Sequence, residues 1–367
     1  MTEKYKKSFT FRSGLTVKNR VMMAPMTNRM SFHNGDLTQD ELDYYALRTG
    51  ELGAVITAAA NVSPNGKGWE GEFSVDSDDN LPSLISLAST IQKNDTKAII
   101  QLFHAGRMTN KKVLRGEQPV SASAIPAERP NAEIPRALME SEILGIIEDF
   151  KAATIRSYQA GFDGIELHGA NTYLIQQFFS PHSNRREDKW GGSLEKRVRF
   201  IEKLVDGVLA LREDFDRPFL IGYRFSPEEY ENPGIRMEDT LFLVDKLADK
   251  ALDYLHISLN QYDRVSQSDA YQEQSILQYI HKKIDGRLPL VSVGGIQRGK
   301  DLQDAMQDSE LAALGRVLLT EPHWVKKVFN DREEELRLTI APEDYEELKI
   351  KRAMAPFLKG MMTDRIR

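Results

Sequence analysis

Short apolar runs recur eight times along this chain, and segments with helical periodicity separate them. The segment 141–159 is one such spacer, because its apolar side chains recur every three or four positions, as on one face of a helix. Each apolar run has the length of a buried strand. Strands that alternate with helices form parallel sheets, so the pattern predicts about eight βα units. The eight runs span residues 20–26, 54–59, 98–103, 164–168, 219–225, 254–258, 288–293 and 311–314.

Eight βα units can form a closed barrel or an open doubly wound sheet. An open sheet that binds a dinucleotide normally carries a GxGxxG turn after its first strand, whereas the first run here ends in APMTN at 24–28. Neither a linker nor a shift in composition divides the 367 residues. The sequence therefore predicts an α/β fold, a TIM (β/α)8 barrel formed as a single domain over residues 1–340. The irregular stretch 106–135 is expected to be a loop or hairpin inserted at the C-terminal face. Residues 341–367 are expected to form a helical tail on the barrel or a neighbouring subunit.

Composition narrows the class of protein. The formal net charge of -6 argues against a nucleic-acid binder, which usually carries a concentrated basic face. No apolar run approaches the roughly 20 residues needed to span a bilayer, and the charged start MTEKYKKSFTF is unlike a secretory signal. We therefore expect a cytoplasmic protein that acts on a small molecule. Because the chain has no cysteine, disulfides, iron–sulfur clusters and thiolate nucleophiles are excluded, and redox chemistry requires a bound organic cofactor or a metal.

Polar side chains follow several of the apolar runs, and in a barrel the C-terminal ends of all strands meet at one face. His168, Asn171 and Tyr173 follow the fourth run. An imidazole and a carboxamide can both donate to one oxygen, and a phenol can supply a proton from another direction. A structural role explains any one of them equally well, but the grouping favours a site that polarises a carbonyl group. The other residues at the run ends are Pro25, Met26, Thr27, Ala59, Gln101, His104, Arg107, Arg224, Gly294, Gly295, Gly315 and Arg316.

Glycines follow the seventh and eighth runs, in VSVGGI at 291–296 and LGR at 314–316. Barrels commonly bind phosphate at these positions, because glycine lets backbone N–H groups approach an anion and a guanidinium can neutralise it. Tight turns alone would explain either motif. Their occurrence together and in this order favours a phosphate site.

Several ordered motifs carry a family resemblance. They are NRVMMAPMT at 19–27, QLFHAGR at 101–107, IELHGANTYLIQQFFSP at 165–181 and NRREDKWGGS at 184–193, followed by the VGG and LGR turns. On these motifs the chain resembles the Old Yellow Enzyme family of FMN-dependent NADH:flavin oxidoreductases and ene-reductases over nearly its full length. It is similar to the short, single-domain bacterial type.

The resemblance implies a barrel that holds FMN noncovalently. Pro25, Met26 and Thr27 would lie beside the isoalloxazine ring, and Ala59 would leave room for it. Gln101 would bind its pyrimidine edge, while Arg224 would place positive charge near N1 and O2. The phosphate would lie at Gly294, Gly295, Gly315 and Arg316.

The resemblance also implies the reaction. NADH or NADPH would reduce the flavin, and an activated C=C bond of an α,β-unsaturated carbonyl compound would then accept the hydride. His168 and Asn171 would hold the carbonyl oxygen, and Tyr173 would protonate the α-carbon. His104 and Arg107 are expected to hold the loop after the third strand in place. Arg185, Arg186 and Asp188 are expected to form ion pairs that stabilise the long loop after the fourth strand.

The chain departs from the family pattern at three positions. Thr27 replaces the redox-tuning cysteine of one branch, while Trp190 and Lys196 replace a tyrosine and an asparagine, and we expect the last two to alter loop packing. The preference between NADH and NADPH and the oligomeric state stay open. Homo-oligomers are common among such enzymes, and in some relatives a C-terminal arginine, here Arg365 or Arg367, reaches a neighbouring site.

Three alternative functions remain. A general NAD(P)H oxidoreductase would pass electrons to oxygen, a quinone, a nitro compound or a metal oxyanion. A metal-dependent hydrolase would use His104, Glu166 and His168, although an HxH pair and paired carboxylates are missing from the strand ends. A flavin-binding protein without enzymatic activity would have no use for Tyr173 as a proton donor.

Overall fold

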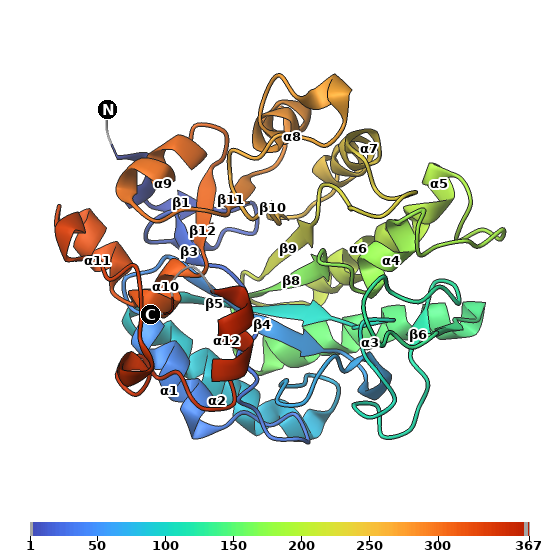
Figure 1. Ribbon diagram of the computed structural model, residues 1–367, viewed down its shortest axis with the longest axis horizontal. Helices are drawn as coiled ribbons and strands as arrows, with labels where there is room; N and C mark the ends of the chain where they lie inside the picture. Colours follow the sequence, from blue (N-terminus) through green and yellow to red (C-terminus); the bar gives the residue numbers. More distant parts are fainter. Residues whose placement is uncertain (1–2, 363–365, 367) are drawn as a thin grey trace.

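Eight parallel strands close into a barrel in the computed structural model, which describes residues 3–362 and 366 (Figure 1). Around the barrel the order is β10-β11-β12-β3-β4-β5-β8-β9, so the predicted TIM-barrel fold is confirmed. One strand lies in each predicted run, within one to three residues of its ends. The strands are β3 (Val21–Met23), β4 (Ala54–Asn61), β5 (Lys97–Phe103), β8 (Gly164–Gly169), β9 (Leu220–Phe225), β10 (Tyr254–Ile257), β11 (Leu290–Val293) and β12 (Leu311–Leu314).

Helices form the outer layer around the strands (Figure 1). The predicted helix over 141–159 is α3 (Glu140–Gln159), and its periodic apolar side chains are buried against the barrel. Its start is stabilised by Glu142, whose carboxylate accepts the backbone N–H of Met139 at 2.8 Å. The other α-helices are α1 (Gln39–Arg48), α2 (Leu81–Gln92), α4 (Leu174–Phe179), α5 (Leu194–Arg197), α6 (Arg199–Ala210), α7 (Met237–Ala248), α8 (Ile276–Ile284), α9 (Gly299–Ala305), α10 (Val317–Thr320), α11 (Trp324–Phe329) and α12 (Ala355–Met361). Within the described residues, none of these helices has the length and apolar character needed to cross a membrane.

A short N-terminal hairpin covers the end of the barrel at which the strands begin. Its two antiparallel strands are β1 (Phe9–Thr10) and β2 (Thr16–Val17), and the sequence analysis did not predict them. Phe11, Leu15 and Val17 are buried in one apolar cluster with the first residues of several barrel strands. Two-residue strands leave no periodicity to detect, so only packing reveals this hairpin.

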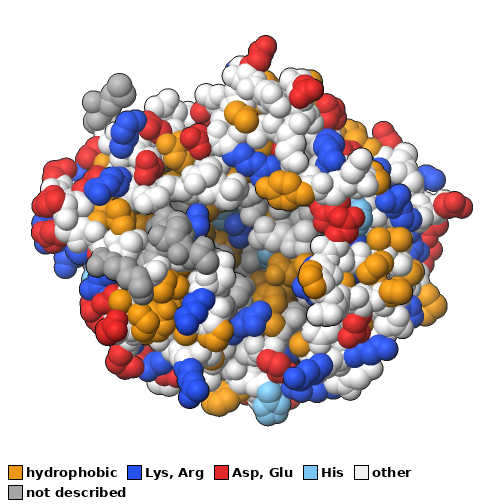
Figure 2. Space-filling view, viewed as in Figure 1, with side chains coloured by type: hydrophobic (Ala, Val, Ile, Leu, Met, Phe, Trp, Pro, Cys, Tyr) orange, Lys and Arg blue, Asp and Glu red, His pale blue; other side chains and the backbone are white. Residues whose placement is uncertain are grey.

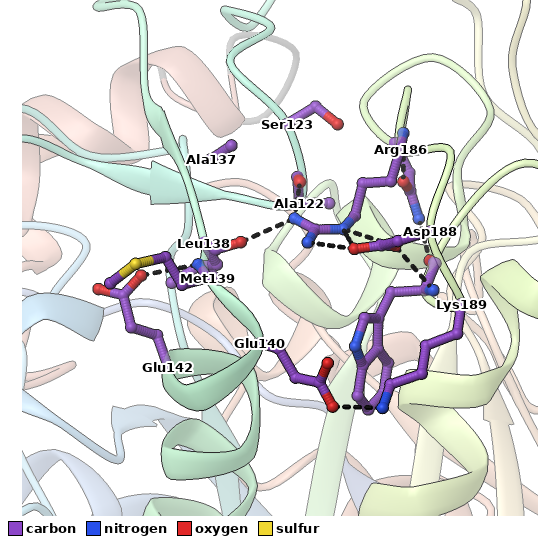
Figure 3. Close-up of polar contacts among 12 residues, drawn as sticks. Ala122, Ser123, Ala137, Leu138, Met139, Glu140, Glu142, Arg186, Asp188 and Lys189 are labelled. Carbon is purple, nitrogen blue, oxygen red and sulfur yellow. Dashed lines mark hydrogen bonds and ion pairs between the residues drawn. The ribbon is translucent and has the colours of Figure 1, made fainter.

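Long loops build up the opposite, C-terminal face of the barrel. The irregular segment 106–135 is mostly loop, as predicted, and contains the short strand β6 (Val120–Ser121). This strand pairs in parallel with β7 (Arg136–Ala137), which follows the segment directly. Arg186 joins this segment to the loop after α4 (Figure 3). Its guanidinium donates to the carbonyls of Ala122 and Leu138 at 2.9 and 2.8 Å and pairs with Asp188 at 2.6 Å. The ion-pair role predicted for this loop is confirmed for Arg186 and Asp188, whereas Arg185 donates to the His182 carbonyl at 2.9 Å instead.

The C-terminal segment packs on the same domain. Leu348, Met354 and Leu358 are buried in the main core, and Arg48 of α1 donates to the Leu348 carbonyl at 2.8 Å. Of the tail predicted as helical, only η8 (Pro342–Asp344) and α12 are helical in the described part, while the charged stretch between them lies in turns. Lys349 has a φ of 55°, a left-handed conformation that ends a helix. Arg365 and Arg367 lie outside the described residues.

Candidate active site

A cavity of about 490 Å³ lies at the C-terminal ends of β3, β9, β11 and β12. This volume is within the range of small-molecule and cofactor sites. Its wall is largely built by residues that come directly after barrel strands, as the sequence predicted. Seven of the ten residues predicted to bind FMN line it: Pro25, Met26, Arg224, Gly294, Gly295, Gly315 and Arg316.

Glycines shape one end of this cavity. Gly294 has a φ of 110°, which an L side chain rarely adopts, and a Cβ there would lie 2.5 Å from the Leu259 carbonyl oxygen. At Gly315 the nearest neighbours of an added Cβ are Met26 and Ala24, at 3.8 and 3.9 Å, so a larger side chain would extend into the cavity. Arg316 lines the same end. Exposed backbone and a guanidinium together suit a phosphate group.

Arg224 of β9 supplies positive charge on the cavity wall. It is buried, and burial lowers the pKa of its guanidinium while Glu166 opposes that effect. Nη2 donates to Ser258 Oγ at 3.1 Å, whereas Nε has no hydrogen-bond partner among the described residues. An unpartnered, buried N–H beside a cavity is a donor for a ligand. The cavity and its donor set therefore fit FMN, as the sequence predicted.

A buried polar network lies next to Arg224, between β5, β8 and β10. Glu166 accepts from Gln101 Nε2 at 2.7 Å and contacts His256 Nδ1 at 2.8 Å. Burial opposes ionisation of Glu166, but the charge and hydrogen bond of His256, together with Arg224, lower its pKa from the ordinary value. The carboxylate of Glu166 thus orients the side-chain amide of Gln101.

His168, at the end of β8, is buried and neutral. Its pKa lies well below the ordinary value because burial disfavours the charged form and the charges of Arg224 and His256 add to that effect. Nδ1 accepts the backbone N–H of Ala170 at 3.4 Å. The proton of the neutral ring therefore lies on Nε2, which makes Nε2 a hydrogen-bond donor.

Asn171 is held by two serines that directly follow β9 and β10. It has a φ of 54°, a left-handed conformation that asparagine tolerates, and its backbone N–H donates to Ser226 Oγ at 2.9 Å. Its Oδ1 accepts from Ser258 Oγ at 3.0 Å, and Ser258 in turn accepts from Arg224. Because the carbonyl oxygen of the carboxamide is engaged in this way, the side chain has its Nδ2 left as a hydrogen-bond donor.

Tyr173 packs its ring in an aromatic cluster with His168, Phe103 and Trp69. The ring lies edge-on to Phe103 at 4.9 Å and to His168 at 5.0 Å, with Trp69 at 6.2 Å. Burial, assisted by the charge of Glu72, raises the pKa of Tyr173 above its ordinary value. The phenol therefore keeps its proton at neutral pH.

Residues 7–335 match the sequence model of the NADH:flavin oxidoreductase / NADH oxidase family. The chain belongs to this family. As a member of the NADH:flavin oxidoreductase family it is an enzyme that uses FMN as its cofactor and NAD(P)H as its reductant. The resemblance to Old Yellow Enzymes found in the sequence is confirmed.

Two curated relatives and one solved structure define how the chain relates to known family members. It is 43% identical over 326 residues, 88% of its length, to "NADH:acrylate oxidoreductase" of Vibrio harveyi, but spans only 32% of that protein. It is 41% identical to "Probable NADH-dependent flavin oxidoreductase YqiG" of Bacillus subtilis (strain 168), covering 94% of both chains. A structure of morphinone reductase in complex with tetrahydroNAD superposes with a TM-score of 0.75 and 26% identity, covering 89% of this chain and 91% of the other.

Not every predicted site residue of this family member lies on the first cavity. Thr27 and Tyr173 line a second cavity of about 450 Å³, and Asn171 lines a third of about 660 Å³. Ala59 packs with Phe103 in the aromatic cluster. The second and third cavities adjoin the same short segment after β8, and the third shares Leu259 and Asn260 with the first, so the structure brings the predicted residues to one face.

Four functional neighbours were missed by sequence reasoning. Ser226 and Ser258 directly follow β9 and β10, so their place at strand ends was a usable signal. Trp69 and Glu72 lie in the loop after β4, and nothing local in the sequence marks their proximity to Tyr173. Their placement depends on how this loop folds back over the barrel.

The arrangement does not support the metal-hydrolase alternative. Both oxygens of Glu166 are engaged by Gln101 and His256. His104 instead contacts Asn65 at 3.2 Å and accepts the Gly106 N–H at 3.0 Å, in agreement with its predicted structural role. Arg107 is structural too, since its guanidinium donates to two loop carbonyls at 3.1 and 3.0 Å.

Proposed function

We propose that this enzyme is an ene-reductase, which reduces the activated C=C bond of α,β-unsaturated carbonyl compounds with NAD(P)H. The observation that carries the proposal is the donor pair next to a phenol. His168 Nε2 and Asn171 Nδ2 are both oriented as donors by hydrogen bonds on their other atoms, and Tyr173 packs against His168.

The residues of the first cavity would hold FMN. Arg224 would contact the polar edge of the ring, and Gly294, Gly295, Gly315 and Arg316 would bind the phosphate. When bound, FMN takes a hydride from NAD(P)H and delivers it to the substrate. The protein contributes binding, orientation and proton transfer.

The paired donors would act on the carbonyl oxygen of the substrate. Two hydrogen bonds to this oxygen withdraw electrons from the conjugated system, so the β-carbon becomes the acceptor for hydride. Both donors are held in place before substrate arrives, because Ala170 fixes the ring of His168 and Ser258 fixes the carboxamide of Asn171. Such preorganisation lowers the cost of reaching the transition state.

Tyr173 would complete the reduction by giving its hydroxyl proton to the α-carbon. The C=C bond then gains one hydride and one proton in total, and a solvent proton restores the phenol. The raised pKa of Tyr173 keeps this proton in place until negative charge develops on the substrate.

A general NAD(P)H:acceptor oxidoreductase is the second candidate, since the description of the family includes NADH oxidase. Electron transfer to oxygen, a quinone, a nitro compound or a metal oxyanion requires the cofactor cavity but no proton donor for carbon. The names of two relatives support reduction of a C=C bond: the Vibrio harveyi acrylate enzyme and "NADH:fumarate oxidoreductase" of Klebsiella pneumoniae (strain 342), which is 38% identical to this chain. Acrylate and fumarate both contain such a bond. The chain spans 32% and 40% of those two proteins, so this support extends to part of each.

The test is anaerobic reduction of the FMN-loaded enzyme by NADH or NADPH, followed by reoxidation with 2-cyclohexenone. Recovery of the flavin absorbance with formation of cyclohexanone supports the ene-reductase. The Tyr173→Phe variant should lose at least a hundredfold in the rate with the enone and keep its rate with oxygen. Recovery with oxygen or a quinone but not with any enone would refute the proposal in favour of the second candidate.

A further inference from the structure

The second cavity adjoins the proposed proton donor and is called the basic cavity below. Its volume is about 450 Å³, and Thr27 and Tyr173 form part of its wall. Trp69 and Met108 add apolar surface beside them. A group bound here would lie next to the carbon that Tyr173 protonates.

The charged side chains that line the basic cavity are mostly cationic. They are Arg29, from the loop after β3, and Lys112 and Arg129, from the segment 106–135. Glu70 is the one carboxylate among the described lining residues, and it is paired with Arg115 at 3.1 Å. With three cationic groups against one paired carboxylate, the lining has a net positive charge at neutral pH.

The pKa of Tyr173 shows that two of these cations lie near its hydroxyl group. Burial and Glu72 raise the pKa of Tyr173, and the charges of Arg129 and Arg29 act in the opposite direction. Both guanidinium groups therefore lie within electrostatic reach of the phenol. Glu72 itself is buried, which raises its pKa well above the ordinary value and favours its neutral form.

The third cavity, on the side of Asn171, has the opposite character. Four carboxylates line it, those of Glu128, Glu228, Glu229 and Glu231, with Arg264 as the one basic residue among the described lining residues. The space-filling view shows a hollow near the centre of this face, with basic side chains below it and acidic ones at its upper right (Figure 2). An anionic substituent is thus attracted to one side of the site and repelled from the other.

We infer that the natural substrate carries a carboxylate in addition to its activating carbonyl group, and that Arg129, with Lys112 and Arg29, binds this carboxylate in the basic cavity. The inference rests on the proposed function for the placement of the carbonyl. It makes Arg129 a specificity-determining residue, because a guanidinium binds a carboxylate through two parallel hydrogen bonds. A neutral enone would use the same catalytic groups without this contact.

Binding of saturated analogues tests the inference without requiring turnover. Isothermal titration of the oxidised, FMN-loaded enzyme with monomethyl succinate and dimethyl succinate compares two probes that differ by one ester methyl. The monoester should bind with a Kd at least tenfold lower than that of the diester. Arg129→Gln should raise the Kd of the monoester about tenfold and change the Kd of the diester by less than twofold. Arg129→Lys should restore part of the preference. Lys111→Gln, an exposed neighbour of Lys112 outside the cavity lining, is the matched control and should change neither Kd.

Equal Kd values for the two probes, or equal weakening of both by Arg129→Gln, would overturn the carboxylate site. The extra phosphate of NADPH is the other anion that the basic cavity could bind, and titration with NADP+ and NAD+ tests for it. If Arg129→Gln weakened only NADP+ and left the monoester unchanged, the basic cavity would belong to the phosphate of the reductant. Failure of the proposed function appears elsewhere, as the absence of reduction of dimethyl fumarate and monomethyl fumarate alike. Binding preference without turnover would leave the anion site standing and refute only the ene-reductase.

Discussion

Replacing Ser258 with alanine removes the hydroxyl that orients the carboxamide of Asn171. In the wild type, Ser258 Oγ donates to Asn171 Oδ1 at 3.0 Å and accepts from Arg224 Nη2 at 3.1 Å. Without this hydroxyl the carboxamide can turn over and present its oxygen, instead of its N–H, to the substrate carbonyl. A neutral hydrogen bond contributes about 1 kcal/mol net, which corresponds to a roughly fivefold loss in kcat/KM.

The assay is kcat/KM for 2-cyclohexenone at saturating NADH, with the FMN content of each variant measured by absorbance. Ser258→Thr keeps a hydroxyl and is the control for packing. A double-mutant cycle, compared at equal FMN content because Ser258 also contacts Arg224, decides whether Ser258 acts on the enone through Asn171. In the Asn171→Ala background, Ser258→Ala should have no further effect. If the two substitutions reduced kcat/KM independently, the orienting role of Ser258 would be refuted.

Three further predictions concern the cofactor site and pH dependence. Gly315→Val should raise the Kd of FMN at least tenfold in a fluorescence titration of the apoprotein, because its methyl groups extend into the cavity, whereas Gly145→Ala, in open space on α3, should not. Because the pKa of His168 is lowered, kcat/KM for a neutral enone should stay flat from about pH 6 to 8; an inflection near pH 6.5 that disappears in His168→Asn would contradict this. Burial lowers the pKa of His104 to about 3, so its contribution to stability is present above the unfolded-state pKa of about 6.5 and is lost as the pH falls. Between pH 7 and 5 this loss is about 2 kcal/mol, and urea unfolding should show a pH dependence smaller by that amount in His104→Gln.

The barrel and the positions of most candidate site residues could be predicted from the amino-acid sequence. Apolar runs at a regular spacing are a local signal, and a chain of alternating strands and helices has few ways to bury them. Because polar groups at the C-terminal face of a barrel follow the strands, the place of His168, Asn171, Tyr173 and Arg224 at this face could be predicted from sequence position. The glycines after the seventh and eighth strands were found in the same way.

The hydrogen-bond partners of these groups, and the side chains that surround them, became known from the three-dimensional structure. Ser258 lies 87 residues from Asn171, and no periodicity or motif links the two. Trp69 and Arg129 reach Tyr173 from loops whose paths depend on packing across the barrel face. Strand positions follow from local hydrophobic pattern, whereas hydrogen-bond partners and the sign of a cavity's charge follow from contacts between distant segments, which a local pattern does not encode.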